Sequence, residues 1–219
     1  MTKVTGGRNT FFEGPKTWPS GPERPEKKVF GQDPSFSRGY IKLKDVSAVF
    51  KFDFRNKTVL DIGSSTGGFT KYALEKGAKK VIAIEKGTNQ MEAPLRYDER
   101  IELHEKTDFF TFENFKEKID VILADISFMS LKTILEHAKK INKNSETEYL
   151  VMLKPQFEAK KSDLNKGIVK NEKTRREIIK NFEFWLKQNN FVIIKKRDNE
   201  LKGKHGNVER FYWLKVSKS

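Results

Sequence analysis

The sequence predicts an α/β fold in which a mostly parallel sheet of seven strands is covered by helices on both faces. Short apolar runs alternate with amphipathic runs along most of the chain, which is typical of parallel strands joined by helices. One apolar run ends in a glycine-rich turn, as strands do at the ligand-binding edge of such sheets. Two further strand-like runs, separated by a loop with two glycines, close the chain and predict a terminal antiparallel strand.

Residues 1–34 are expected to form an irregular basic arm. This segment is rich in proline and glycine, carries scattered lysines and arginines, and shows no hydrophobic period. Two interpretations stay open: the arm contacts RNA phosphates, or it is a passive solvated tail. Its aromatic residues Phe11, Phe12, Trp18 and Phe30 favour docking of part of the arm on the domain.

Residues 35–219 are predicted to form one domain. A helix begins after Ser37, a plausible N-cap, because apolar residues from Leu43 to Phe50 follow at helical spacing. The predicted strands are Thr58–Ile62, Lys80–Glu85, Ile101–His104, Asp120–Asp125, Tyr149–Leu153, Phe191–Lys196 and Val208–Val216. The other predicted helices are Phe69–Lys76, Asn89–Arg96, Leu131–Ile141 and a longer one that begins near Asn171.

The turn after the first strand is the most informative segment of the chain. Its glycines are not spaced as in the dinucleotide pattern G-x-G-x-x-G, but in the form that S-adenosylmethionine enzymes use. The turn therefore predicts that a nucleoside-containing cofactor lies against bare backbone, and an ordinary βα turn is the alternative. The predicted cofactor contacts are Asp61, Gly63, Ser64, Ser65, Thr66, Gly67, Gly68 and Phe69.

Acidic residues after the next two strands extend this predicted cofactor site. Glu85 ends the second strand about 20 residues beyond the turn, where a carboxylate can accept hydrogen bonds from both ribose hydroxyls. Thr107 and Asp108 follow the third strand, and Asp108 is expected near the exocyclic amine of an adenine. A solvent-facing strand end for Glu85 and a helix cap for Asp108 are the alternatives.

Asp125 and Lys154 end the fourth and fifth strands and are the candidates for chemistry. A carboxylate at the end of an apolar strand is costly to bury alone, so Asp125 needs a cation or hydrogen-bond donors. The strand order of this sheet type places Asp125 and Lys154 on neighbouring strand tips, beside the reactive end of the cofactor. A lysine in such a place can act as a base.

Composition and charge narrow the class of protein. Lys and Arg number 44 against 30 Asp and Glu, so the net charge is +14, which favours polyanions such as nucleic acid, although lysine-rich surfaces also serve solubility. The absence of cysteine excludes disulfides, thiolate metal sites and cysteine nucleophiles. Three histidines without metal-ligand spacing predict no metal. No apolar run has the length of a membrane span, so we expect a cytoplasmic protein.

Five segments in this order resemble the haemolysin-A-like (TlyA) family of ribosomal-RNA methyltransferases, relatives of the FtsJ-type ribose 2′-O-methyltransferases. The segments are SRGYIKL, DIGSSTGGFT, DISFMSL, KPQFE and GNVERF. Each segment is weak alone, but the set covers about Ser35 to Trp213 and is specific together. The resemblance implies the Rossmann-like methyltransferase fold, the cofactor S-adenosyl-L-methionine and an RNA substrate, most often ribosomal RNA.

The resemblance also implies a catalytic tetrad of Lys42, Asp125, Lys154 and Glu209. In that scheme Lys154 takes or orients the proton of a ribose 2′-hydroxyl, while the other three set its charge and position. From their sequence positions alone, Lys42 and Glu209 are most simply surface charges. The resemblance further implies RNA contacts by Arg38, which suits a phosphate, and by Lys42.

The sequence departs from the family pattern in two places. Members usually carry an N-terminal S4-type RNA-binding module, which residues 1–34 do not resemble, and Glu85 stands where Asp is more usual. The expected activity is RNA ribose 2′-O-methylation. The alternatives are an RNA-binding protein with a vestigial cofactor pocket and a membrane-active haemolysin, and the sequence predicts no oligomeric state.

Overall fold

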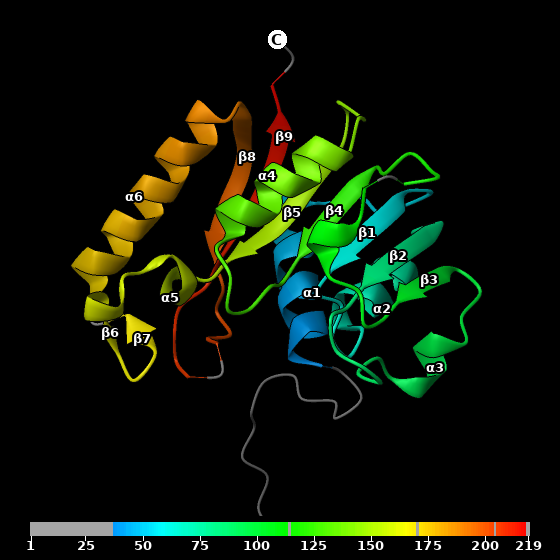
Figure 1. The fold of residues 1–219 in the computed structure, drawn as a ribbon, viewed down its shortest axis with the longest axis horizontal. Helices are drawn as coiled ribbons and strands as arrows, with labels where there is room; N and C mark the ends of the chain where they lie inside the picture. Colours follow the sequence, from blue (N-terminus) through cyan, green and yellow to red (C-terminus); the bar gives the residue numbers. More distant parts are fainter. Residues whose placement is uncertain (1–36, 114, 170, 204, 218–219) are drawn as a thin grey trace, which may run out of the picture. The chain divides into compact units, whose positions relative to one another are not determined.

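The computed structural model describes residues 37–217, apart from 114, 170 and 204. The predicted arm, residues 1–34, lies outside the described residues. One seven-stranded sheet organises the described part of the chain, in the order β3-β2-β1-β4-β5-β9-β8 (Figure 1). The strands are β1 (Thr58–Ile62), β2 (Lys80–Ile84), β3 (Ile101–His104), β4 (Val121–Ala124), β5 (Glu148–Leu153), β8 (Phe191–Asp198) and β9 (Arg210–Val216).

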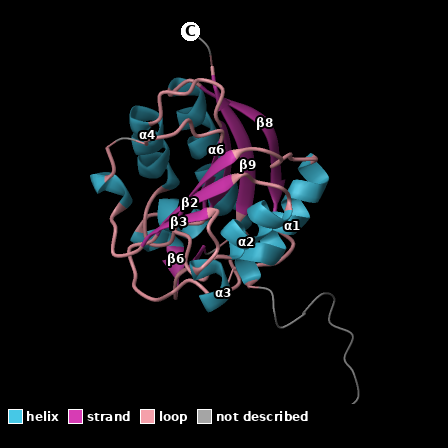
Figure 2. Ribbon diagram, turned by 90° about the vertical axis from the view of Figure 1, so that its right-hand side faces the viewer, coloured by secondary structure: helices cyan, strands magenta, loops and turns pink. Residues whose placement is uncertain are grey.

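Helices cover both faces of this sheet, as the sequence predicts (Figures 1 and 2). Helices α1 (Arg38–Phe50) and α2 (Gly68–Glu75) pack on one face, and α4 (Leu131–Ile141) and α6 (Glu172–Gln188) pack on the other. Two short helices, α3 (Ala93–Arg96) and α5 (Pro155–Glu158), lie in connections. The α/β fold with a mostly parallel sheet is therefore confirmed.

The side chains of the central strands alternate between two hydrophobic cores. In β4, Val121 and Leu123 belong to the core under α1 and α2, while Ile122 and Ala124 belong to the core under α4 and α6. Both cores are buried, because the parallel strands have a helix layer on each side. The same alternation sends the side chain that follows Ala124 toward the α1 face.

Antiparallel strand β9 lies between β5 and β8 rather than at the edge of the sheet. It pairs with β5 from Leu153 opposite Arg210 to Glu148 opposite Lys215. It also pairs with β8, whose register shifts between Ile193 and Lys195. The predicted terminal antiparallel strand is confirmed, and this position brings the end of the chain against the strand that precedes Lys154.

Four predicted elements are shorter in the structure, among them β2, which ends at Ile84, and β4, which runs from Val121 to Ala124. The helix expected over Asn89–Arg96 is only the four-residue α3, because Asn89 has a left-handed φ of 53° and Pro94, the second residue of α3, is favoured only in the first turn of a helix. The last strand begins at Arg210 rather than Val208. The sequence analysis missed α5 and a small hairpin of β6 (Leu164–Asn165) and β7 (Ile168–Val169).

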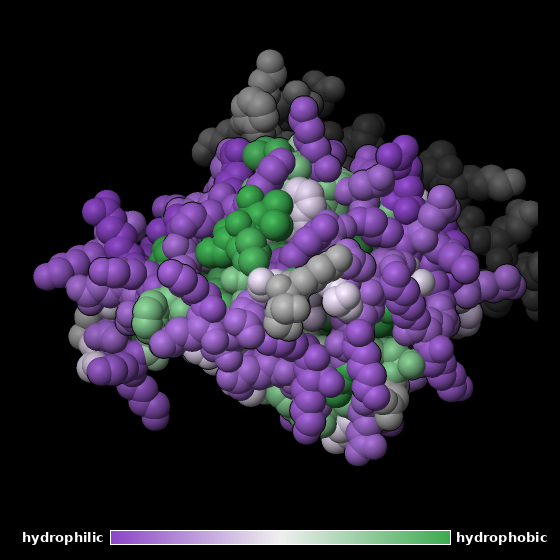
Figure 3. Space-filling model, turned by 90° about the horizontal axis from the view of Figure 1, so that it is seen from above, coloured by the Kyte–Doolittle hydropathy of each residue, from purple (hydrophilic) through white to green (hydrophobic). Residues whose placement is uncertain are grey.

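Hydrophilic side chains predominate on the face shown in Figure 3, around a small group of apolar ones.

Among the described residues, none of the helices combines the length and the apolar character needed to cross a membrane.

Candidate active site

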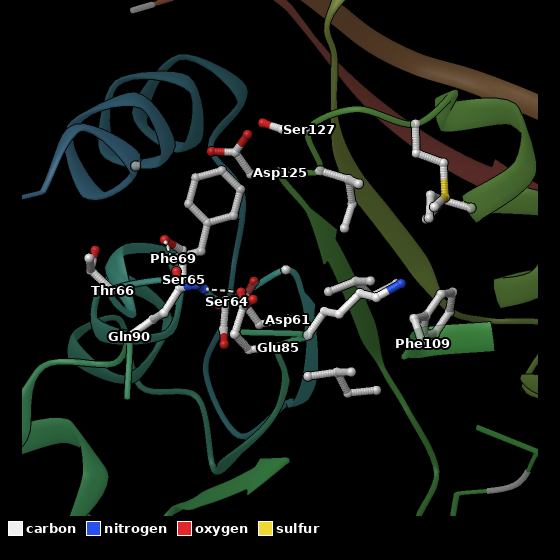
Figure 4. Close-up of a pocket in the computed structure, with 18 of the residues that line it drawn as sticks. Asp61, Ser64, Ser65, Thr66, Phe69, Glu85, Gln90, Phe109, Asp125 and Ser127 are labelled. Atoms are coloured by element: carbon white, nitrogen blue, oxygen red, sulfur yellow. Dashed lines mark hydrogen bonds between the residues drawn. The ribbon is translucent and has the colours of Figure 1, made fainter. Parts of the chain in front are cut away.

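A cavity of about 870 Å³ opens at the carboxyl ends of the parallel strands (Figure 4). Ligands of open α/β sheets bind at this edge, and the volume falls within the range of small-molecule pockets. Its walls come from the carboxyl ends of β1, β2, β4 and β5, from the loop after β3 and from the start of α1. The predicted site residues that line it are Arg38, Asp61, Gly63, Ser64, Ser65, Thr66, Gly68, Phe69, Glu85, Thr107, Asp108, Asp125 and Lys154.

The glycine turn shapes the floor of the cavity because it leaves no room for side chains. Gly67 has a left-handed φ of +89°, and a Cβ atom there would lie 2.5 Å from Leu95 Cδ1. At Gly68 a Cβ atom would lie 2.0 Å from Ser37 Oγ and 2.7 Å from the backbone nitrogen of Tyr40. The glycines therefore let the start of α1 approach the start of α2 at the edge of the cavity.

Asp61 is a buried carboxyl group at the end of β1, below the glycine turn. Its side chain faces α2, where the Thr70 hydroxyl donates a 2.6 Å hydrogen bond to Oδ2. Its Oδ1 atom has no hydrogen-bond partner among the described residues. Burial raises the pKa of Asp61 to about 7; the Thr70 hydrogen bonds lower it, while the charges of Asp125 and Glu85 raise it further.

Glu85 lies beside the glycine turn, as the sequence predicts (Figure 4). Its Oε2 atom accepts a 2.9 Å hydrogen bond from the Ser65 backbone N–H, and Oε1 accepts one of 2.6 Å from the Gly87 N–H. These bonds hold the carboxylate at the wall of the cavity, where one residue of the turn and the end of β2 meet.

Thr107 and Asp108 line the same wall, one strand further along. The Asp108 carboxylate is ion-paired with Lys86 at 2.9 Å and accepts a 3.1 Å hydrogen bond from the Phe110 N–H. The Lys86 ammonium, with that backbone hydrogen bond, holds the pKa of Asp108 below its usual value. The Thr107 hydroxyl donates instead to the Glu105 carbonyl, 3.0 Å away.

Asp125 and Lys154 form an ion pair across the tips of β4 and β5. Lys154 Nζ lies 2.6 Å from Asp125 Oδ1 and donates a 2.9 Å hydrogen bond to Ser127 Oγ. Both side chains line the cavity, and Asp125 and Ser127 are seen at its upper edge in Figure 4. The cation that the sequence analysis required for Asp125 is therefore Lys154.

Lys42 and Glu209 form a second ion pair, which is buried behind the cavity wall. Their side chains are 7% and 4% exposed, and neither lines the cavity. In the β5–β9 ladder Leu153 lies opposite Arg210, so the next positions along the two strands are Lys154 and Glu209. Glu209 and Lys154 are therefore neighbours across the end of the paired strands β5 and β9.

The tetrad residues therefore gather on one face of the sheet, as two ion pairs. By strand alternation, Asp125 and Lys154 face α1, because each follows a residue of the α4 core. Glu209 faces the same way, because it lies two positions before Phe211 of the core under α1, the helix that carries Lys42. Within residues 37–217 as described, no hydrogen bond or ion pair joins one pair to the other.

Arg38 and Lys42, the residues predicted to contact RNA, differ in exposure. Arg38 is exposed at the mouth of the cavity, and its guanidinium donates a hydrogen bond to the Lys202 carbonyl. Lys42 is 6% exposed and paired with Glu209, so in this conformation its ammonium does not reach the surface. The RNA contact of Lys42 stays a prediction that the geometry does not favour.

Among the residues that the sequence analysis missed are Ser127, which lines the cavity and contacts Lys154, and Glu158, which lies outside the lining. Both lie in motifs that it quoted, DISFMSL and KPQFE, but without an assigned role. Glu158 accepts a 2.8 Å hydrogen bond from the Ser130 hydroxyl and one of 2.7 Å from the Leu131 N–H. It thereby caps the start of α4 and ties the loop after Asp125 to the loop after Lys154.

Comparison with known proteins identifies relatives of the whole described domain. The family model of FtsJ-like methyltransferases matches residues 36–216. The 23S rRNA (cytidine-2′-O)-methyltransferase TlyA of Campylobacter jejuni is 37% identical over 179 residues, which are 81% of this chain and 69% of that protein.

Solved structures agree with this result. A protein described as a hemolysin of Streptococcus thermophilus superposes with a TM-score of 0.81 at 33% identity, over 86% of this chain and 70% of that one. A protein of Listeria monocytogenes described as an S-adenosylmethionine-dependent methyltransferase shares the fold, with a TM-score of 0.62 at 17% identity, over 82% of this chain and 98% of that one.

Proposed function

We propose, because this chain belongs to the TlyA/hemolysin A branch of the FtsJ-like methyltransferase family, that it is an S-adenosylmethionine-dependent RNA ribose 2′-O-methyltransferase. Its substrate in this proposal is ribosomal RNA, the substrate named for the Campylobacter relative, and the reaction then takes place in the cytoplasm. Residues 35–219 are proposed as the catalytic domain. The observation that carries the proposal is the Asp125–Lys154 ion pair at the rim of the glycine-turn cavity.

The residues that line the cavity fit a nucleoside cofactor. The glycine turn leaves backbone uncovered, and Asp61 keeps a buried oxygen without a hydrogen-bond partner among the described residues. In our proposal Glu85 holds the ribose hydroxyls and Asp108 the adenine amine, while the turn from Gly63 to Phe69 contacts the remainder. S-adenosylmethionine, when bound, supplies an electrophilic methyl group.

Lys154 is proposed to handle the proton of the ribose 2′-hydroxyl. Asp125 and Ser127 contact its Nζ atom at 2.6 and 2.9 Å, so two directions around the nitrogen are occupied by protein. The described residues offer Nζ no third hydrogen-bond partner, and in our proposal the remaining direction receives the hydroxyl, which Lys154 orients or deprotonates. Holding the reacting oxygen in one place supplies much of the acceleration, because the reaction needs an in-line approach.

The Lys42–Glu209 pair is proposed to position Lys154 rather than to touch the substrate. Glu209 is adjacent to Lys154 across the end of the β5–β9 ladder, and Lys42 neutralises the Glu209 carboxylate in a buried setting. Without Lys42, the buried carboxylate would be an unpaired charge next to the proposed base.

Methyl transfer from isotopically labelled S-adenosylmethionine to ribosomal RNA, followed by digestion to nucleosides, tests the proposed function. Label in a 2′-O-methylnucleoside is expected. Label on a nucleobase would contradict the proposed reaction. RNA binding without uptake of the cofactor would favour the alternative of a vestigial pocket, and release of dye from anionic vesicles would favour the membrane-active alternative.

A further inference from the structure

The two sides of the cavity differ in how their surface cations are paired. On the side of β2 and β3, Lys86 is paired with Asp108 at 2.9 Å and Arg96 with Glu105 at 2.7 Å. Each of these two cations lies against a carboxylate, whereas Lys106, directly after β3, is exposed and has no ion-pair partner among the described residues. This side therefore offers an approaching anion little unpaired positive charge.

On the side of β5 and β9, four lysines form what we call the lysine platform: Lys160, Lys161, Lys166 and Lys202. All four are exposed, and none has an ion-pair partner among the described residues. The first three belong to the segment from α5 through the β6–β7 hairpin, and Lys202 belongs to the β8–β9 loop. Net positive charge is therefore concentrated on this side.

Asn207 holds the two segments of the platform together. Its side chain accepts a 3.1 Å hydrogen bond from the Val169 N–H and donates one of 3.0 Å to the Gly167 carbonyl. Its own carbonyl accepts a 2.8 Å hydrogen bond from the Gly203 N–H, and the residue is 6% exposed. Through its side chain and its backbone carbonyl, this buried residue joins the backbones of the two segments that carry the lysines.

The platform adjoins the proposed catalytic residues. Lys160 follows Lys154 by six positions through α5, and Arg38, at the mouth of the cavity, donates to the carbonyl of Lys202. In Figure 1 the β6–β7 hairpin, α5 and the orange loop after β8 lie at the same end of the sheet as the start of α1. A polymer that enters the cavity can therefore continue directly onto the lysines.

We propose that the lysine platform binds the sugar–phosphate backbone of the RNA strand next to the target nucleotide. This inference rests on the proposed function. If the target ribose lies inside the cavity, the RNA strand that carries it must leave the cavity on one side. Four exposed lysines of the platform have no ion-pair partner among the described residues, against Lys106 on the β2–β3 side, and this difference favours an exit over the platform. Ammonium groups contact phosphates without reading bases, so the platform contributes affinity rather than sequence preference.

The test compares two triple variants of the full chain that remove the same charge. The platform variant is Lys160→Gln, Lys161→Gln and Lys166→Gln. The control variant is Lys116→Gln, Lys118→Gln and Lys143→Gln, at exposed positions near the amino ends of β4 and β5. Binding of a labelled single-stranded RNA of about 20 nucleotides is measured between about 50 and 200 mM salt.

The platform variant is expected to bind this RNA about tenfold more weakly and to lower the salt slope by about two, since each phosphate contact contributes about 0.7. The control variant should change affinity less than about twofold. Equal losses in the two variants would overturn the proposal, because they would show only an effect of net charge. A platform variant that loses binding to phosphatidylserine vesicles but keeps RNA affinity would overturn it in favour of a membrane surface.

Failure of this inference is distinguishable from failure of the proposed function. If the wild-type protein transfers methyl groups to RNA while the platform variant binds RNA normally, only the platform is wrong. If the wild-type protein transfers no methyl group, the proposed function fails whatever the platform binds. Calorimetric titration with S-adenosylmethionine should give the same affinity for both variants, which checks that each is folded.

Discussion

Lys42 on α1 is ion-paired with Glu209, 167 positions later in the chain, and both side chains are almost completely buried. Removing one partner of such a pair leaves the other charge buried without compensation. We expect Lys42→Met to lower the free energy of unfolding by about 3–5 kcal/mol, as measured by urea denaturation. The double variant Lys42→Met/Glu209→Leu should recover most of this loss but none of the methyl transfer, since the buried pair would be replaced by apolar groups. Recovery of activity in the double variant would show that the pair serves the fold alone.

Asp61 should make stability depend on pH. Its pKa is raised to about 7 in the folded protein from 3.8, so between these values the folded state binds more protons than the unfolded state. The free energy of unfolding therefore falls as pH rises from 3.8 to about 7, and it has lost the whole contribution of Asp61 above this range. Asp61→Asn should have little effect near about pH 3, a partial stabilising effect near about pH 5, and should stabilise the protein by up to about 4 kcal/mol near about pH 8. Thermal unfolding across pH measures this, and a difference that does not change with pH would contradict the account.

Glu158 should position the two loops that carry Asp125 and Lys154. Glu158→Ala leaves the Leu131 N–H and the Ser130 hydroxyl without their acceptor and should cost about 1–3 kcal/mol of stability. Because the loops lose their connection, kcat should fall with little change in KM for the cofactor. Glu158→Gln keeps an acceptor oxygen and should recover part of both losses. Glu177→Ala, on the exposed face of α6, is the matched control and should leave both unchanged.

Ser127 should orient Lys154. Ser127→Ala removes the 2.9 Å hydrogen bond to Lys154 Nζ while Asp125 stays in place. The Lys154 side chain can then adopt additional orientations around the remaining contact with Asp125. We expect about a tenfold loss of kcat, equivalent to about 1.4 kcal/mol, with unchanged S-adenosylmethionine affinity. Ser127→Thr retains the hydroxyl and is the conservative control. A loss of the same size in Ser127→Thr would indicate a packing effect.

Local patterns of the sequence predicted most of the fold. Ser37 caps α1 by accepting from the Tyr40 N–H at 3.2 Å, and Asn171 caps α6 by accepting from the Thr174 N–H at 2.8 Å. Both caps act within one turn of helix, so their signals lie in adjacent residues. The neighbourhood of Asp125 and Lys154 also followed from general physics, because parallel strands bring their carboxyl ends to one edge.

The arrangement of β9 was not available from local patterns. Its apolar residues are equally compatible with an edge strand and with a place between β5 and β8. Its position is determined by long-range pairing with these two strands. The pairing of Lys42 with Glu209 depends on the position of β9 beside β5. Their positions in the sequence therefore gave no sign of the pair, and both residues were most simply interpreted as surface charges. The hairpin of β6 and β7 was missed for a related reason: two-residue strands have too few side chains to show an alternation.

The central claim is that Lys154 handles the proton of a ribose 2′-hydroxyl beside a bound methyl donor. A single-turnover measurement of methyl transfer to RNA, with Lys154→Met against the wild-type protein at saturating cofactor, tests it most directly. The account predicts that Lys154→Met still binds S-adenosylmethionine, by calorimetry, and transfers the methyl group at least about 100-fold more slowly. Transfer at the wild-type rate by Lys154→Met would contradict it.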